Sequence, residues 1–288
     1  MQVTMLADTE PRVRRVAVGQ FDGVHLGHRA VIAGSDTVLT FEPHPLAVNR
    51  PQAMPKLLTS LERKADLVAD LGVGELVVIP FDDAFAAQSP ADFIDQVLVG
   101  RLGATHVSVG TNFRFGHGAA GDTDLLAADR RFATQVVTLV EVDSQIVSSS
   151  HIRALIQSGD VAGAAILLGS PFQLRGDVVR GDRRGRQLGF PTANIVPDPS
   201  LICPAYGVYA ARAQGTGAAV SIGVRPTFGD GRAPLVEAYL LDRDIDLYGA
   251  QLRIDFLHRL RGELRFDSAS ALIEQMERDV LETRRLCG

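Results

Sequence analysis

Two histidines stand three residues apart in a glycine-rich segment that follows an apolar run. The segment GQFDGVHLGH covers residues 19–28 and contains His25 and His28. Gly19 would end a strand and a helix would begin near His28, so both imidazoles and several backbone N–H groups would lie at a helix N-terminus, where anions bind. Gly27 would let the chain approach a ligand closely. The pattern favours nucleotide phosphates over a metal, because the histidines lack cysteine partners and HExxH spacing.

A second segment combines glycines and arginines. GDVVRGDRRGRQLGFPTANI covers residues 176–195 and includes Gly181 and Arg186. Backbone N–H groups and guanidinium groups so close together can share a phosphate. The same composition also describes a solvated basic hairpin, so the residue types alone leave both interpretations open.

A lone carboxylate lies in an apolar strand pattern further along the chain. In PLVEAYLL (234–241), a period of two puts Leu235, Glu237 and Tyr239 on one face. Such a carboxylate lies either at a sheet edge or in a partly buried place with a purpose. Partial burial would raise its pKa and suit it to accept a proton.

Three further features have both a structural and a functional interpretation. SSSHIR (148–153) provides an N-cap, yet Arg153 one turn into that helix opposes the helix dipole unless an anion binds there. His44 between two prolines is either a rigid turn or a ligand contact. GHGAAG (116–121) and Glu141 match a dinucleotide fingerprint, but the motif does not directly follow a strand. We interpret this segment as a glycine loop beside the site.

These residues need a scaffold, and the first half of the chain alternates strand and helix patterns. Residues 59–72 predict a helix with a capping box of Thr59 and Glu62, and 89–98 predict a helix capped by Ser89. The alternation is typical of an open, mostly parallel α/β sheet that binds ligands at the carboxyl ends of its strands. Short β-branched runs predict the strands at 14–19, 36–41, 75–80, 105–110 and 135–142.

The pattern changes after two short helices within 148–171. Strands then follow in series, and a helix begins at Ser268, which predicts an antiparallel sheet or small barrel with a helix against it. We expect two domains, 1–168 and 169–288. The later strands are expected at 207–213, 218–223, 235–241 and 251–260.

Composition narrows the class of protein. The 288 residues carry a formal net charge of −5, so no general basic surface points to nucleic acid or an anionic membrane. Cys203 and Cys287 form no CxxC pair. The acidic start lacks a secretion signal, and the apolar runs are too short to cross a bilayer. We expect a cytoplasmic protein without nucleic-acid or membrane partners, and leave a homo-oligomer open.

The motifs together resemble a known family. GQFDGVHLGH resembles the HxGH motif of the nucleotidyltransferases. With TFEPHP (40–45), VGTNFRFGHGAAGD (109–122) and VSSSHIRALIQSGD (147–160), it resembles the adenylyltransferase half of the bifunctional riboflavin kinase/FAD synthetases. GFPTAN (189–194) is similar to the PTAN motif of the riboflavin kinases.

The resemblance implies roles for individual residues. In the first half, Asn112 would lie near the flavin or the phosphates. In the second half, Thr192 and Asn194 would hold Mg²⁺ and ATP phosphates, and Glu237 would take the proton of the riboflavin 5′-hydroxyl. His25, His28 and Arg153 would stabilise charge on the departing phosphates. The other implied nucleotide contacts are Gly19, Phe21, Asp22, His44, Ser148, Ser149, Gly181 and Arg186.

The resemblance implies a Rossmann-like nucleotidyltransferase domain followed by a β-barrel kinase domain with a terminal helix. It also implies ATP-dependent conversion of riboflavin to FMN and of FMN to FAD. Two features depart from the family pattern: residues 29–39 are too few for an average helix and a strand start, and Ser150 replaces a more usual Thr. The alternatives are a riboflavin kinase whose first domain is inactive and a non-catalytic flavin-binding protein.

Overall fold

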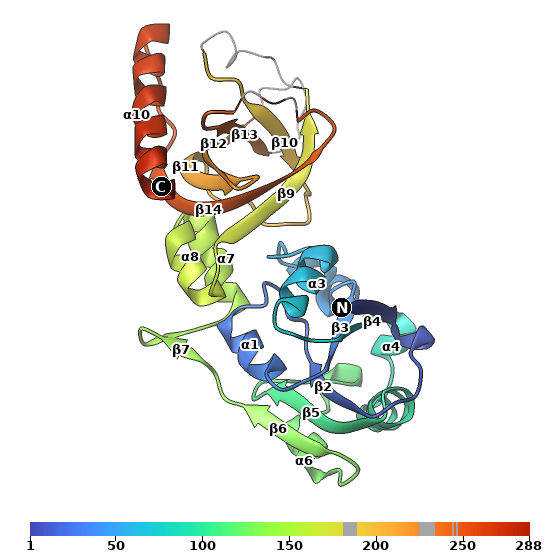
Figure 1. The fold of residues 1–288 in the computed structure, drawn as a ribbon. Helices are drawn as coiled ribbons and strands as arrows, with labels where there is room; N and C mark the ends of the chain where they lie inside the picture. The colour runs from blue at the N-terminus through green and yellow to red at the C-terminus, as the bar shows by residue number, and fades with distance from the viewer. Residues whose placement is uncertain (181–188, 225–233, 244, 246) are drawn as a thin grey trace. The chain divides into compact units, whose positions relative to one another are not determined.

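The structure is a computed structural model and describes residues 1–180, 189–224, 234–243, 245 and 247–288. The chain divides into two compact units, Met1–Ser149 and Ser150–Gly288 (Figure 1). The first unit is built on an open parallel sheet, and the second on a closed barrel.

The sheet of the first unit has the order β1-β4-β3-β2-β5-β6, and every neighbouring pair is parallel. The predicted parallel α/β fold is therefore confirmed. β1 was not predicted, because one buried residue, Thr4, gives it no apolar alternation. The strands are β1 (Gln2–Met5), β2 (Arg14–Val18), β3 (Thr37–Glu42), β4 (Glu75–Pro80), β5 (Ala104–Gly110) and β6 (Ala133–Val137).

The last predicted strand of this half, 135–142, is wrong in its extent. β6 ends at Val137, and Glu141–Val142 forms β7, which pairs with β8 (Gln145–Ile146) in a separate hairpin. Asp143 and Ser144 both have positive φ and turn the chain back between these two strands.

Helices cover both faces of the parallel sheet. β2 shows how its side chains divide: Val16 and Val18 face one core, and Ala17 faces the other. The first core packs under η3 (Phe93–Arg101), the π-helical continuation of α5 (Pro90–Asp92), and under α6 (Thr123–Ala128). The second packs under α1 (Leu26–Ile32) and α3 (Leu61–Ala69). The short helices are η1 (Leu6–Asp8), α2 (Pro45–Asn49), η2 (Pro51–Ala53), α4 (Asp83–Ala86) and η4 (His117–Ala119).

The helix caps are partly as expected. Ser89 is the N-cap of α5, as predicted, and the structure adds a capping box between Ser89 and Asp92. The predicted capping box of Thr59 is wrong, because Ser60 is the N-cap of α3. The hydroxyl of Thr59 instead accepts the backbone N–H of Gly23, at 3.1 Å.

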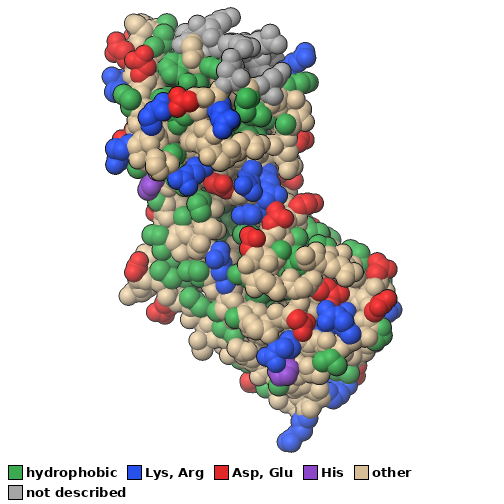
Figure 2. Space-filling model, in the orientation of Figure 1, with side chains coloured by type: hydrophobic (Ala, Val, Ile, Leu, Met, Phe, Trp, Pro, Cys, Tyr) green, Lys and Arg blue, Asp and Glu red, His purple; other side chains and the backbone are tan. Residues whose placement is uncertain are grey.

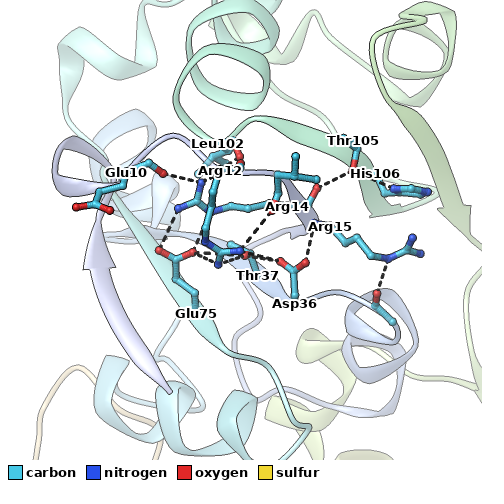
Figure 3. A network of polar contacts seen from close by, with 12 residues as sticks. Glu10, Arg12, Arg14, Arg15, Asp36, Thr37, Glu75, Leu102, Thr105 and His106 are labelled. Atoms are coloured by element: carbon cyan, nitrogen blue, oxygen red, sulfur yellow. Dashed lines mark hydrogen bonds and ion pairs between the residues drawn. The ribbon is translucent and has the colours of Figure 1, made fainter.

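A buried ion pair holds the amino ends of the strands together (Figure 3). Arg14 is 1% exposed, and its Nε donates to Glu75 Oε2 at 2.9 Å. Arg12 donates to the same oxygen at 2.7 Å, and Arg14 also donates to the carbonyl oxygens of Glu10 and Leu102. The buried guanidinium is thus hydrogen-bonded along both edges, as a buried charge requires.

The second unit begins with a helical hairpin and continues into a closed antiparallel barrel of order β10-β13-β12-β11-β14-β9. The predicted barrel and terminal helix are confirmed, and Ser268 is the helix N-cap. The elements are α7 (Ser149–Ser158), α8 (Val161–Leu168), β9 (Phe172–Val179), β10 (Ala193–Pro197), β11 (Gly207–Ala213), β12 (Thr216–Val224), β13 (Pro234–Leu240), β14 (Gln251–Arg261) and α10 (Ala269–Cys287).

The surface carries both signs of charge. On the face that Figure 2 shows, cationic and anionic side chains are interspersed over both units. In the part of the chain that the structure describes, no helix combines the length and apolar character that a membrane crossing requires.

Candidate active sites

The first candidate site lies at the carboxyl edge of the parallel sheet. The chain order of the strands reverses between β2 and β5, and ligands of open α/β sheets bind at such switch points. His25 and His28 follow β2, His44 follows β3, and Asn112 follows β5. The fold therefore brings these four predicted residues to one edge of the sheet.

His25 is the N-cap of α1, which begins at Leu26 rather than near His28. Its Nδ1 accepts the backbone N–H of His28 at 3.2 Å. In the neutral ring the proton then lies on Nε2, which can donate to an anion. The two imidazoles are stacked with centroids 3.5 Å apart, and the ring of Phe21 meets His28 edge-on at 5.4 Å. Both rings are thus held in a defined orientation.

Gly27 packs closely against the ring of His25. A Cβ at this position would lie 3.2 Å from Cε1 of His25 and 3.3 Å from its Nδ1. The glycine therefore leaves room for the imidazole of His25, and its close approach to a ligand stays a prediction. The preceding turn is also strained, because Phe21 and Val24 have φ values of 49° and 42°. Such strain is typical of functional sites.

Asp22 fixes this turn to its surroundings. Its carboxylate accepts the backbone N–H groups of Leu58 at 2.9 Å and Thr59 at 3.1 Å. Its carbonyl oxygen accepts the hydroxyl of Ser149 at 3.0 Å. Asp22 is buried, so a direct nucleotide contact for it stays a prediction.

His44 and Asn112 flank the turn on the neighbouring strands. His44 is the N-cap of α2, and its Nδ1 accepts the N–H of Leu46 at 3.1 Å. This bond fits both interpretations of His44. Asn112 is exposed, and its Oδ1 would lie 3.4 Å from a Cβ on Gly110.

Sequence reasoning missed an aromatic group beside Asn112. Phe113 stacks on Phe115 with centroids 5.6 Å apart, and Phe115 meets Phe93 at 5.3 Å. Phe81 and Phe85 extend the group, and these two and Phe113 are only partly buried. The phenylalanines are far apart in sequence, and their common feature is that they follow or cover strand ends.

The glycine loop has no dinucleotide-fingerprint geometry. Residues 116–121 are closed by paired backbone hydrogen bonds between Phe115 and Gly121, of 3.1 and 2.9 Å. The GHGAAG motif begins at the entrance of this loop and does not directly follow a strand. This supports its interpretation as a glycine loop and not a dinucleotide fingerprint. Gly116 is needed because a Cβ there would lie 2.7 Å from Pro90.

The serine-rich segment spans the boundary of the two units. Ser148 and Ser149 belong to the first unit, and Arg153 lies partly buried on α7 in the second. Their joint action on phosphate stays a prediction.

The second candidate site lies on the outer surface of the barrel. Glu237 on β13 is paired with Asn194 of β10 on one side and with Ser221 of β12 on the other. Directly paired residues project to the same face, so the three side chains form a row across three strands. The flanking Val236 and Ala238 are fully buried inside the barrel. Glu237 is thus partly buried in mid-sheet, not at an edge.

Asn194 and its neighbours complete this row. Asn194 is 8% exposed, and its Nδ2 donates to the carbonyl oxygen of Thr192 at 3.5 Å. The amide is therefore oriented with its carbonyl oxygen away from that contact. Phe190 meets the ring of Tyr239 edge-on at 5.3 Å, two residues along the strand from Glu237. Gly181 and Arg186 lie outside the described residues.

Comparisons with known proteins assign both units. Residues 7–151 match the family model for FAD synthetase, and residues 168–287 match the model for riboflavin kinase. The chain belongs to the bifunctional riboflavin kinase/FMN adenylyltransferase family. It is an enzyme with both domains of that family, which acts on flavins and ATP.

Individual relatives extend over nearly the whole chain. The bifunctional riboflavin kinase/FMN adenylyltransferase of Bacillus subtilis (strain 168) is 39% identical, over 94% of this chain and 91% of the relative. That of Escherichia coli (strain K12) is 38% identical, over 95% and 92%. A crystal structure from Streptococcus pneumoniae, described as a macrolide-efflux protein, has a TM-score of 0.88 at 28% identity and covers 99% of both chains.

Proposed function

We propose that each unit houses one of the two reactions, with the kinase in 169–288 and the adenylyltransferase in 1–168. The observation that carries this proposal is the presence of two separate polar sites, one at the carboxyl edge of the parallel sheet and one on the barrel. ATP is a substrate of both reactions, and we place the enzyme in the cytoplasm, where a reducing environment suits its two free cysteines.

In the kinase reaction, Glu237 takes the proton of the riboflavin 5′-hydroxyl. The alkoxide oxygen forms a bond to the γ-phosphorus of ATP, and the bond to the β,γ-bridging oxygen breaks, which gives FMN and ADP. Glu237 lies partly buried between Asn194 and Ser221 on the row of polar side chains, where it can meet the hydroxyl of the substrate. The adjacent rings of Phe190 and Tyr239 offer an apolar edge to the substrate.

A divalent cation fits the donor set on this face. The orientation of the Asn194 amide presents a neutral oxygen, and Thr192 supplies a hydroxyl, which are hard ligands of the kind that Mg²⁺ takes together with phosphate oxygens. Among the described residues no cluster of three or more His, Cys, Asp or Glu side chains could hold a metal. Mg²⁺ bound with ATP would neutralise charge on the phosphates.

In the adenylyltransferase reaction, a phosphate oxygen of FMN attacks the α-phosphorus of ATP, and pyrophosphate leaves. His25, with its proton on Nε2, and His28 donate to the departing phosphates. Asn112 and the partly buried phenylalanines beside it receive the flavin ring, because planar aromatic ligands stack on such side chains.

Two substitutions test the assignment by a double dissociation. His28→Ala should stop the conversion of FMN to FAD and leave riboflavin phosphorylation intact, whereas Glu237→Gln should do the reverse. Riboflavin and FMN are supplied in separate assays, each with ATP and Mg²⁺, and the products are resolved by chromatography. Ser35→Ala, away from both candidate sites, serves as the matched control. Loss of both steps in either variant would contradict the two-site proposal, and FMN as sole product of the unmodified chain would support an inactive first domain.

A further inference from the structure

Lys64 is one of only two lysines in a sequence whose Lys and Arg total 29. Lys56 is exposed, whereas Lys64 is 2% exposed on the inner side of α3. A buried ammonium group is destabilising unless nearby groups compensate its charge and its hydrogen bonds. Lysine is also more compact than arginine and can lose its proton when buried. Groups that compensate the charge and the hydrogen bonds of Lys64 are therefore expected around it.

The contacts of Lys64 lead to the turn that carries the histidines. Its Nζ donates to Thr40 Oγ1 at 3.1 Å, and that hydroxyl donates to the carbonyl oxygen of Gln20 at 3.1 Å. Gln20 directly follows Gly19, whose N–H donates to Leu39 on β3. The hydrogen-bond chain thus connects α3, through β3, with the beginning of the strained turn.

Two carboxylates act on the ammonium group. Burial lowers the pKa of Lys64 to about 8, and the charges of Asp22 in the turn and Glu42 at the end of β3 oppose that shift. Burial likewise raises the pKa of Glu42. The charges of Glu62 and Asp22 add to that rise, and the charge of Lys64 opposes it. Asp22 and Glu42 are therefore the carboxyl groups whose charge Lys64 offsets at the edge where ATP is expected.

We infer that Lys64 is a positioning residue for adenylyl transfer: its ammonium group braces the turn before His25 and offsets the carboxylates that would otherwise repel the phosphates of ATP. This inference rests on the proposed adenylyltransferase site. Lys64 acts through Thr40 and through its charge, and touches neither substrate. Without its charge, two carboxylates and a polyanion would share one edge of the sheet, which weakens ATP binding.

Enzyme kinetics give the first test. Lys64→Met keeps the length of the side chain and removes the charge, and we expect the KM for ATP in FAD formation to rise about tenfold or more. Riboflavin kinase activity of the same chain should not change. Lys56→Met is the matched control and should leave both reactions unaltered. Lys64→Arg should have a KM closer to that of the unmodified protein than Lys64→Met has, because it restores the charge.

The pH profile adds a readout that a purely structural role would not move. Lys64 is charged below its pKa, so in the unmodified protein the KM for ATP should rise as the pH increases through about 8, and not in Lys64→Met. Equal KM values and equal pH profiles for the unmodified protein and Lys64→Met would overturn the inference.

A second measurement needs no substitution, so it holds even if the variants fold poorly. Labelling lysine with ¹³C gives two side-chain Cε signals, one for each lysine, which report protonation as the pH is varied. ATP with Mg²⁺, in the absence of flavin, should raise the pKa of Lys64 and leave that of Lys56 unchanged, because a nearby polyanion favours the charged form. An unchanged Lys64 titration at saturating ATP would overturn the inference. A protein that forms no FAD from FMN would instead contradict the proposed function.

Discussion

Glu75 shows how a single carboxylate keeps a buried guanidinium in place. Burial alone would raise the pKa of Glu75, but the hydrogen bonds and charge of Arg14, joined by those of Arg12, outweigh it, and the pKa lies below its usual value. A depressed pKa means that the ionised form stabilises the fold. That contribution is present above the ordinary glutamate pKa of 4.5 and is lost as the pH falls through the lower pKa of the folded state.

We expect Glu75→Gln to lower the free energy of unfolding of the first unit by about 3 kcal/mol at neutral pH, because it leaves Arg14 buried without a counter-charge. Urea denaturation at neutral pH and at about pH 3 measures the effect, and the difference from the unmodified protein should shrink in acid. Glu10→Gln is the control, since the Glu10 side chain points away from the network (Figure 3). An equal loss in both variants would contradict this account.

The residue types of the sequence indicated some candidate site residues better than others. His25 and His28 could be found because their spacing and neighbouring glycines are local features of the sequence. Lys64 could not be found from the sequence, because a lysine in an amphipathic helix has the pattern of a surface residue. The purpose of Gly27 also depends on the position of the His25 ring, which the sequence does not contain.

At the scale of elements, the start of α1 sets the geometry of both imidazoles. In Gly27→Ala the new methyl group would displace the His25 ring, and we expect adenylyltransferase activity to fall about 100-fold. The higher helix propensity of alanine favours the folded state by up to about 1 kcal/mol, but displacement of the His25 ring weakens the N-cap bond to His28 by a similar amount, so the stability of the first unit should change little. Activity assays and thermal unfolding of one preparation measure both effects.

Gly74→Ala is the matched control, because its Cβ would meet no atom closer than 3.6 Å. If Gly27→Ala kept full activity, the close packing of Gly27 and His25 would not matter for catalysis.

Apolar alternation predicted most elements, and its failures have physical causes. β9 and β10 were not predicted as strands: the first carries Arg175, Gly176 and Asp177, and the second is bordered by Pro191 and ends at Pro197. Closure of the barrel supplies both strands with partners on each side, which local composition does not reveal.

For the whole molecule, the two reactions are joined by FMN, the product of one and the substrate of the other. No covalent link to the chain is needed, so FMN released by one molecule can be used by another. We expect a mixture of His28→Ala and Glu237→Gln proteins to form FAD from riboflavin, although neither forms it alone. Chromatography measures the rate of FAD formation at several protein concentrations. This rate should rise when the concentration of either variant is increased. No FAD from the mixture would show that FMN passes only within one chain.

The pairing of Asn194, Glu237 and Ser221 has a consequence for how the kinase half can change over evolution. In an open sheet an outer strand can slide by one residue, but each strand of a closed cylinder is held on both sides, so a slip must pass around the whole circumference. A one-residue slip of β13 would turn Glu237 into the apolar interior and Val236 outward. We therefore expect insertions and deletions in this half at its hairpin turns, and the alignment of these three side chains to be inherited as a unit with the closure of the barrel.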